Sequence, residues 1–259
     1  MSLTISTRNA RFQQWEALLS NRNKRHRAGE FLVQGVRPIT LAVREGWPIH
    51  ALIHRSGGAL SKWALELLNT VDTQHVAMAD ELLEELAEKE TELIAVVGQR
   101  PDNLNRIQQT KDSLVVIFDR PSSPGNIGTL IRSADAFGAS GMIVTGHAAD
   151  VYDPKAVRAS TGSLFTLPVV RVDRYPHEWF AGRVVGLDED ASAELGELDL
   201  TGPTALVVGN EAHGMSAGWR AACDVTAYIP IGGGASSLNA AAAGTVALYE
   251  AARQRRIQG

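Results

Sequence analysis

Three glycine-containing loops hold the side chains of this chain that could do chemistry. The first, RPSSPGNIGTLIRSADAFG, carries Asn126 and Arg132; the second, NEAHGMS, carries Glu211 and His213; the third, GGGASSLN, carries Ser237 and Asn239. Amide, hydroxyl and guanidinium groups can orient a polar substrate and stabilise negative charge that develops on an oxygen. A single loop of this kind would equally fit a tight strand-to-helix connection capped by Ser or Asn. The occurrence of three favours a shared site.

Each loop follows an apolar run that must position it. From residue 113 onward there are six such runs: LVVIFD, GMIVTG, LPVVRV, RVVGLD, TALVVGN and VTAYIPI. Nearly continuous apolar runs that alternate with helical segments predict an open α/β sheet of parallel strands, buried on both faces. Ligands bind such sheets outside the carboxyl ends of the strands, so we expect the three loops to meet at that edge. Gly232, Gly233 and Gly234 indicate a close approach of the main chain to a ligand.

Several common nucleotide and metal sites have no counterpart in the sequence. The Gly-Lys-Ser/Thr of a P-loop is missing, and no GxGxxG follows the first strand of this half. A nucleotide-dependent oxidoreductase on a doubly wound sheet therefore lacks its phosphate-binding fingerprint. His50 and His54 form the only close histidine pair, without HExxH, so we expect no metal.

The first hundred residues form a separate pattern. Short β-like runs such as EFLVQG, IHALIH and QHVAM alternate with segments in which apolar residues recur three or four positions apart. This pattern predicts a small α/β domain over residues 1–100. The polar segment 101–112 contains a Pro-Asp-Asn turn signal and is interpreted as a linker, followed by a second domain over 113–259.

A block of basic residues lies within the first thirty positions. Its members are Arg8, Arg11, Arg22, Lys24, Arg25 and Arg27, and they stand against only Glu16 and Glu30. Such a block can neutralise phosphates, and it favours a nucleic-acid partner. A solvated helix face with a mobile tip would explain the same residues.

The composition is typical of a soluble globular protein. The chain has 259 residues, 44% of them hydrophobic and 21% charged, with a net charge of −4. It starts without an apolar signal region, and no run approaches the roughly 18 apolar residues of a membrane span, so we expect a cytoplasmic protein without a membrane partner. The single cysteine, Cys223, excludes an internal disulfide.

In order and spacing the three loops resemble the three motifs of the SpoU/TrmH family of RNA 2′-O-ribose methyltransferases. DRPSSPGNIGTLIRSADAFGA resembles the first motif, LVVGNEAHGMS the second and IPIGGGASSLNAAAAGTVALYE the third. The resemblance covers residues 113 to about 253, and YDPKAVRASTGSLFTLPV fits the middle section of the family. Residues 1–100 resemble, more weakly, a small ribosomal-protein-like RNA-binding domain. Two positions depart from the commonest pattern: His213 replaces a frequent Arg, and Ile231 replaces a frequent Met.

The resemblance implies a fold, an assembly and a cofactor. The carboxyl-terminal domain would contain a deep trefoil knot that binds S-adenosylmethionine, and the protein would be a homodimer. The alanine run before Gly244 agrees with close helix packing, either between subunits or within one subunit. The positions that would bind the cofactor are Thr145, Gly209, Ile229, Ile231 and Leu238.

The resemblance also implies an activity: methyl transfer to a ribose 2′-hydroxyl of structured RNA. Arg132 would act on the hydroxyl as a base or, since a guanidinium remains protonated in proteins, as a cation that binds phosphate and the forming alkoxide. Asn126, Ser237 and Asn239 would orient the nucleotide, and Glu211 would either take part in catalysis or hold its loop. The long first domain favours ribosomal RNA over transfer RNA. A transfer-RNA methyltransferase and a non-catalytic RNA-binding or ribosome-assembly protein are the alternatives.

Overall fold

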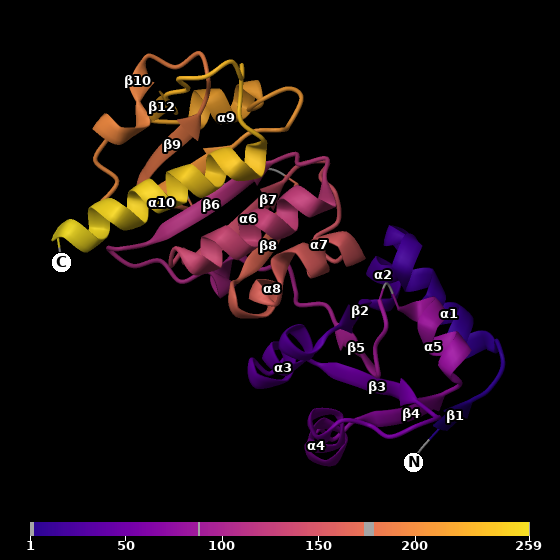
Figure 1. The fold of residues 1–259 in the computed structure, drawn as a ribbon. Coiled ribbons are helices and arrows are strands. Elements are labelled where there is room, and N and C mark those ends of the chain that lie inside the picture. The colour runs from indigo at the N-terminus through magenta and orange to yellow at the C-terminus, as the bar shows by residue number, and fades with distance from the viewer. Residues whose placement is uncertain (1–2, 88, 174–178, 259) are drawn as a thin grey trace. The chain divides into compact units, whose positions relative to one another are not determined.

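A computed structural model describes residues 3–87, 89–173 and 179–258 (Figure 1). By its internal contacts the chain divides into two compact units. The first combines Met1–Arg100 with Tyr152–Thr166, and the second combines Pro101–Val151 with Leu167–Gly259. No helix in the described ranges is long and apolar enough to cross a membrane. The two units are described separately below.

A mixed five-stranded sheet forms the centre of the first unit. Its strand order is β1-β4-β3-β5-β2, with parallel pairing among β1, β4 and β3 and antiparallel pairing of β5 with both of its neighbours. The bounds are Leu3–Ile5 for β1, Glu30–Gln34 for β2, Ile49–Arg55 for β3, Gln74–Met78 for β4 and Leu93–Gly98 for β5. The runs EFLVQG, IHALIH and QHVAM predicted β2, β3 and β4 correctly, whereas β1 is too short to show a pattern.

Five helices from the first hundred residues pack with this sheet. They are α1 (Ala10–Ser20), α2 (Arg22–Ala28), α3 (Val36–Arg44), α4 (Lys62–Thr70) and α5 (Asp80–Leu86). The side chains of Asn9 and Asn21 accept hydrogen bonds from the first-turn amides of α1 and α2, which fixes where both helices begin. Phe12, Trp15 and Leu18 recur three residues apart and are buried, so this face of α1 belongs to the core.

Two helices that come later in the sequence also belong to the first unit. These are α7 (Pro154–Ser160) and α8 (Ser163–Thr166). Trp47 donates a hydrogen bond from Nε1 to the carbonyl oxygen of Phe165 at 3.0 Å, and their rings meet edge to face 5.2 Å apart. Phe31 packs against the Tyr152 ring at 4.7 Å between centroids. The contacts thus assign residues 152–166 to the first unit, whereas the boundaries at residues 100 and 112 remain a prediction.

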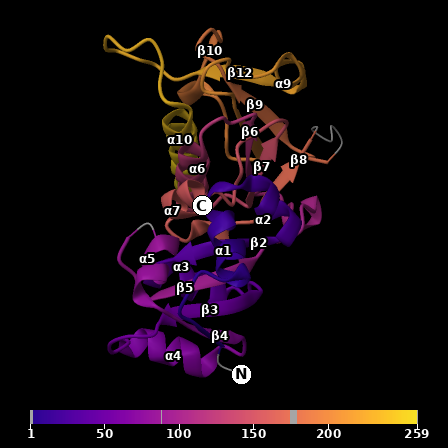
Figure 2. The same ribbon diagram turned by 90° about the vertical axis from the view of Figure 1, so that its right-hand side faces the viewer.

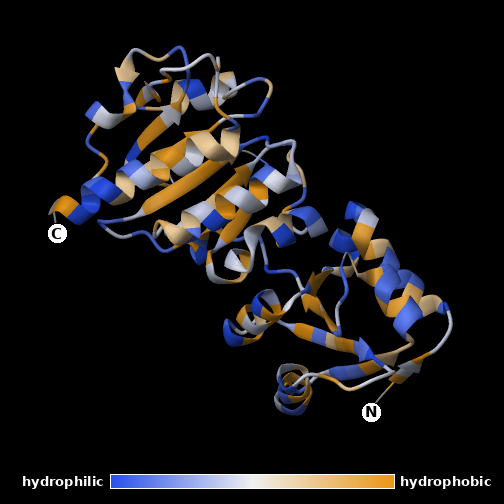
Figure 3. Ribbon diagram, viewed as in Figure 1, coloured by the Kyte–Doolittle hydropathy of each residue, from blue (hydrophilic) through white to orange (hydrophobic). Residues whose placement is uncertain are grey.

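The second unit is built on a seven-stranded sheet in which every recorded pairing is parallel. Its strand order is β10-β12-β9-β11-β6-β7-β8. The bounds are Leu114–Asp119 for β6, Gly141–Thr145 for β7, Val169–Val172 for β8, Arg183–Leu187 for β9, Ala193–Glu194 for β10, Thr204–Val208 for β11 and Val225–Tyr228 for β12. The predicted parallel α/β sheet is confirmed, with β10 as the strand that the sequence did not reveal. The central strands are orange in Figure 3, as expected for strands buried on both faces.

Helices cover the two faces of this sheet. On one face α6 (Pro124–Ala136) packs against α10 (Ala240–Gln258), which also contacts β11 (Figure 1). On the other, Trp219 of α9 (Ala217–Ala222) joins Val115, Ile117 and Val207 in one buried cluster. The short 3-10 helices η1 (Leu104–Arg106) and η2 (Leu195–Glu197) complete the unit. Ile107, within the predicted linker, is buried in the same cluster as Val115 and Ile117, so this part of the segment is packed chain.

The strand order places a switch point between β6 and β11. From β6 the chain passes through α6 to β7 on one side, whereas from β11 it passes through α9 to β12 on the other side. The loops that follow two such neighbouring strands leave in opposite directions, and ligand sites of open parallel sheets commonly lie near such a point. These loops carry the first and second sequence motifs.

Close packing of α10 explains the glycine in its alanine-rich run. A Cβ atom on Gly244 would lie 2.6 Å from Cδ1 of Leu130 and 3.1 Å from Cγ2 of Val208. Both neighbours belong to the same chain. Packing within one subunit, one of the two explanations for this run, therefore accounts for Gly244.

We predict that Gly244→Ala lowers the thermal midpoint, although alanine is the better helix former by roughly 1 kcal/mol. Overpacking against Leu130 costs about 1–3 kcal/mol, which exceeds that gain. The double variant Gly244→Ala/Leu130→Val should lose less stability than the sum of the two single changes. The control is Gly218→Ala in α9, where a Cβ would meet nothing within 4 Å. A Gly244→Ala protein at least as stable as the Gly218→Ala control would contradict this packing.

Candidate functional site

The loops after β6 and β11 are joined by the carboxylate of Glu211. Its Oε2 atom accepts hydrogen bonds from the backbone N–H and the hydroxyl of Ser122, at 2.9 and 2.8 Å. Its Oε1 atom accepts from the backbone N–H of Ser123 at 3.1 Å and from Nδ2 of Asn126 at 2.9 Å. Ser123 is also the N-cap of α6. One side chain of the second motif thus fixes the start of the helix that carries the first.

The third motif joins the same network through Asn239. Its Nδ2 atom donates to Oδ1 of Asn126 at 3.2 Å, while its Oδ1 atom accepts from the backbone N–H groups of Ala241 and Ala242 at the start of α10. The chain Asn239–Asn126–Glu211 therefore contains one residue from each of the three motifs. The structure brings these three predicted residues together, in agreement with the expected convergence of the loops.

The hydrogen bonds to Glu211 keep it ionised. Partial burial acts to raise the pKa of this carboxyl, but the hydrogen bonds from Ser122 and Asn126 outweigh burial and hold the pKa below its ordinary value. An ionised carboxylate can accept from all of these donors at once. The contacts thus support the role of holding the loop, the second of the two roles expected for Glu211.

A second carboxylate, Asp119 at the end of β6, ties the core of this edge together. It is buried, and its Oδ1 atom accepts from the hydroxyl of Thr145 at 3.1 Å. Its Oδ2 atom accepts from the backbone N–H of Ser216 and from Nε of Arg120, at 2.8 and 3.1 Å. Thr145 in turn accepts a hydrogen bond from Nε1 of Trp219 at 3.1 Å. Thr145, predicted to bind the cofactor, lies in this buried network and does not line the pocket described next.

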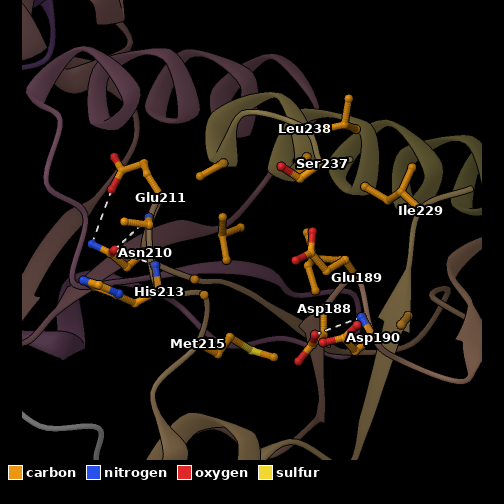
Figure 4. A pocket seen from close by; sticks show the side chains of 18 of the residues that line it. Asp188, Glu189, Asp190, Asn210, Glu211, His213, Met215, Ile229, Ser237 and Leu238 are labelled. Atoms are coloured by element: carbon orange, nitrogen blue, oxygen red, sulfur yellow. Dashed lines mark hydrogen bonds between the residues drawn. The ribbon is translucent and has the colours of Figure 1, made fainter. Parts of the chain in front are cut away.

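A pocket of about 420 Å³ opens beside these loops (Figure 4). Six predicted site residues line it: Gly209, Glu211, Ile229, Ile231, Ser237 and Leu238. In Figure 4, Ile229, Ser237 and Leu238 lie on one side, and Asp188 and Asp190 lie across from them. The volume falls within the range of small-molecule sites, and the lining combines apolar side chains with many polar and charged ones.

Gly209 is required by the turn that forms one wall of the pocket. A Cβ atom there would lie 2.3 Å from the carbonyl carbon of Gly214 and from the nitrogen of Met215. The turn is closed by two backbone hydrogen bonds between Asn210 and Gly214, both 3.0 Å long. The side chain of Asn210 also donates to the carbonyl oxygen of Arg120 at 2.7 Å and accepts from the N–H groups of Ala212 and His213. The GN pair of the second motif thus has a structural role that sequence reasoning did not assign.

The acidic side of the pocket was also missed. Asp188, Glu189 and Asp190 follow β9 and line the pocket together with Arg220, which pairs with Asp188. The sequence did contain a feature that could have predicted this acidic side: the run RVVGLDED ends in three consecutive acids, at the carboxyl end of a predicted strand. This acidic side gives the pocket a negative charge, which suits a cationic ligand.

Arg132 lies away from the pocket of its own chain. It is exposed on α6, six residues after Asn126, and it is not among the residues that line the pocket. Residues 230–239 are exposed as well, and Figure 2 shows this loop extending from the second unit. Gly232, Gly233 and Gly234 have open space where a Cβ would be, so in the single chain they meet no close neighbour.

The predicted RNA-binding residues lie on the first unit, and all except Arg25 are exposed. Arg8 pairs with Glu16 and Glu85, and Arg11 donates to the side-chain oxygen of Gln74 at 3.1 Å. Arg22, Lys24 and Arg27 lie on α2. The prediction for Arg25 is wrong, because only 2% of its surface is exposed and its guanidinium is bonded inside the unit. Within the described ranges there is no group of three His, Cys, Asp or Glu side chains that could hold a metal ion.

Models of two known domain families match the two halves of the chain. Residues 9–97 match the model of the SpoU L30e-like domain, and residues 113–249 match that of the SpoU rRNA Methylase family. The chain belongs to the SpoU rRNA methylase family. A 23S rRNA (uridine(2479)-2′-O)-methyltransferase from Streptomyces viridochromogenes is 58% identical over 97% of this chain and 92% of that protein.

Solved structures of methyltransferases have the same fold. The SpoU methyltransferase AviRb from Streptomyces viridochromogenes, in complex with the cofactor AdoMet, is 58% identical with a TM-score of 0.92, over 97% of this chain and 100% of that one. An AdoMet-bound rRNA methyltransferase from Sinorhizobium meliloti is 27% identical with a TM-score of 0.87, over 97% and 98% of the two chains. The suspected family and the two-domain α/β architecture are confirmed.

We predict that Glu211→Gln lowers the free energy of unfolding by about 2 kcal/mol at pH 7, because an amide nitrogen replaces an acceptor among several donors. The pKa of Glu211 is lowered on folding, so its stabilising contribution is complete above the unfolded-state pKa, about 4.3, and is lost as the pH falls through the folded-state value. The difference between the wild type and the variant should therefore shrink below about pH 4. Urea unfolding from pH 3 to pH 8 measures it, with Glu197→Gln, at an exposed position, as the control. A pH-independent difference would contradict the role given to the ionised carboxylate.

Proposed function

We propose that this protein transfers a methyl group from S-adenosylmethionine to a ribose 2′-hydroxyl of structured RNA, and that the RNA is ribosomal. The observation that carries the proposal is the hydrogen-bonded chain Asn239–Asn126–Glu211 beside the pocket lined by Gly209, Ile229 and Leu238. It joins the three sequence motifs at one sheet edge. The names of the Streptomyces and Sinorhizobium relatives support ribosomal RNA over transfer RNA.

The pocket fits S-adenosylmethionine in chemistry. Ile229, Ile231 and Leu238 offer apolar contact to an adenosine, and the acids that follow β9 complement the positive sulfonium and ammonium groups. When bound, the cofactor supplies an electrophilic methyl group. The chain then has three tasks: to hold the cofactor, to orient the ribose, and to stabilise the charge that develops on the 2′-oxygen.

Arg132 is proposed to perform the last of these tasks. As a cation it would bind the phosphate next to the reacting ribose and stabilise the forming alkoxide, while another acceptor removes the proton. Asn126 and Asn239 hold each other in place, so they would present a fixed polar surface to the nucleotide. Ser237 lies on the pocket lining, where it can contact either ligand.

We further propose that the protein acts as a homodimer and that each Arg132 serves the pocket of the partner. Support comes from the position of Arg132, which does not line the pocket of its own chain, and from exposed apolar residues of the second unit. These are Ile231 and Leu238 in the extended loop and Val246 and Tyr249 on α10. The trefoil knot belongs to the same proposal. A cytoplasmic location is also part of this proposal, because the Streptomyces and Sinorhizobium relatives are bacterial proteins and bacteria assemble their ribosomes in the cytoplasm.

We predict that Arg132→Ala reduces methyl transfer to ribosomal RNA by roughly a hundred-fold or more, while S-adenosylmethionine still binds with near wild-type affinity. Tritium transfer from the labelled cofactor measures the first quantity, and calorimetry the second. If Arg132→Ala retains most of its activity, the proposed catalytic role is wrong. A wild-type protein that binds RNA but not the cofactor would favour the non-catalytic alternative.

Mixed dimers test the origin of the arginine. Arg132→Ala removes the cation, and Leu238→Arg places bulk and positive charge in the pocket. Each variant alone should be inactive. If Arg132 serves the partner, mixing the two subunits under exchange conditions should restore activity, because one site of each mixed dimer then combines an intact pocket with an intact Arg132. Absence of restoration, with subunit exchange verified by mass, would show that the arginine acts within its own chain or that no dimer forms.

A further inference from the structure

The buried Arg25 has a task inside the first unit. Its Nη1 atom donates to the carbonyl oxygen of Leu18 at 2.8 Å and lies 3.4 Å from that of Leu19, at the end of α1. Its Nη2 atom pairs with Oδ2 of Asp153 at 3.4 Å, although the two residues are 128 positions apart in sequence. A charge buried to this degree is stable only when it is paired and hydrogen-bonded.

Asp153 is the N-cap of α7. Its Oδ1 atom accepts from the backbone N–H of Lys155 at 3.0 Å, while its carbonyl oxygen accepts from the N–H groups of Ala156 and Val157. One carboxylate thus caps α7 with one oxygen and pairs with Arg25 of α2 with the other. The two helices, both labelled in Figure 1, are tied at this point.

The exposed charged side chains of α2 and α7 themselves are of one sign. Asp153 is the only carboxylate in residues 22–29 and 152–166, and Arg25 neutralises it. Lys24 and Arg27 of α2 and Lys155 and Arg158 of α7 are exposed. Lys155 and Arg158 follow Asp153 by two and five residues, so both lie within about 8 Å of the tie along the axis of α7.

We propose that α2 and α7 form one cationic surface, made of Lys24, Arg27, Lys155 and Arg158, that binds the phosphates of folded RNA, with Arg25 and Asp153 as positioning residues. The inference rests on the proposed function and deepens it. Half of this surface comes from α7, which lies within the part of the sequence that matches the methylase model. Because the chain as a whole carries a net charge of −4, such a patch directs a polyanion to one place.

Folded RNA is the partner that this surface fits best. Structured RNA is recognised largely through its shape and its phosphates, and a rigid pair of short helices can match both. In the earlier part of the basic block, Arg8 is paired with Glu16 and Glu85, so its charge is already partly neutralised. We therefore expect α2 and α7 to supply more phosphate contacts than the residues before α1.

Charge removal on α7 tests the surface itself. The double variant Lys155→Ala/Arg158→Ala should bind a protein-free 23S rRNA transcript roughly ten-fold more weakly at 0.15 M salt, and the slope of log affinity against log salt should fall by about two. The control Lys62→Ala/Lys111→Ala removes the same charge at exposed positions elsewhere. Equal losses in the two double variants would overturn the proposal, because the effect would then follow net charge alone.

Asp153→Asn tests the positioning role. Asparagine is as good an N-cap as aspartate, so α7 should still begin at the same residue. The change removes one negative charge from the protein, so simple electrostatics would predict tighter RNA binding. The positioning role predicts weaker binding, because Arg25 loses its counter-ion and α2 and α7 are no longer held together. Tighter binding by a variant with a wild-type circular dichroism spectrum would overturn this role.

Two measurements on the same samples separate this inference from the proposed function. Calorimetry with S-adenosylmethionine should be unchanged in Lys155→Ala/Arg158→Ala, while the KM for RNA rises and kcat stays near its wild-type value. If the wild type transfers methyl groups and this variant matches the Lys62→Ala/Lys111→Ala control in RNA binding, the inference alone fails. If the wild type transfers none but its RNA binding depends on Lys155 and Arg158, the proposed function alone fails.

Discussion

The hydrogen bonds of Glu211 hold the edge of the sheet on which the candidate site is built. Both oxygens of its carboxylate accept hydrogen bonds from Ser122, Ser123 and Asn126, in the loop between β6 and α6 and the first turn of α6. The same loop is also held by the side chain of Asn210, which donates to the carbonyl oxygen of Arg120. Because β6 and β11 are neighbours in the sheet, the loops that follow them start side by side, and Glu211 can reach the start of α6. The position of Asn126, and through it that of Asn239, follows from this contact.

Asp119 holds the buried part of this sheet edge by hydrogen bonds, as Glu211 holds its exposed part. One oxygen fixes Thr145 on the next strand, while the other fixes the chain at Ser216, just before α9. Between them, the two carboxylates connect three strand ends and the starts of two helices. The donors to Glu211 are backbone N–H groups and neutral side chains, whereas Asp119 also forms a salt bridge with Arg120. The negative charge beside the pocket comes instead from the separate run of acids after β9.

Parallel sheets made much of the site predictable from sequence. Apolar runs located six of the seven strands of the second unit, and the rule that ligands bind at the carboxyl ends of strands then brought Glu211, Asn126 and Asn239 together. Prediction failed where a residue's role depends on partners far away in sequence. Thr145 looked like a residue of the rim but is bonded to Asp119 and Trp219, and Arg25 looked like part of an exposed basic block but pairs with Asp153. Nothing in the sequence of the basic block distinguishes the buried Arg25 from its exposed neighbours.

The packing of residues 152–166 has a consequence for how this protein can be divided. Phe165 and Tyr152 complete the aromatic cluster around Phe31 and Trp47, so the first unit is finished only after more than half of the chain has been synthesised. A fragment that ends near residue 100 would leave those rings uncovered, and one that begins near residue 113 would carry two helices without their partners. The two halves therefore cannot be exchanged between relatives as independent domains. A chimaera of two family members must take α7 and α8 from the same parent as the amino-terminal sheet.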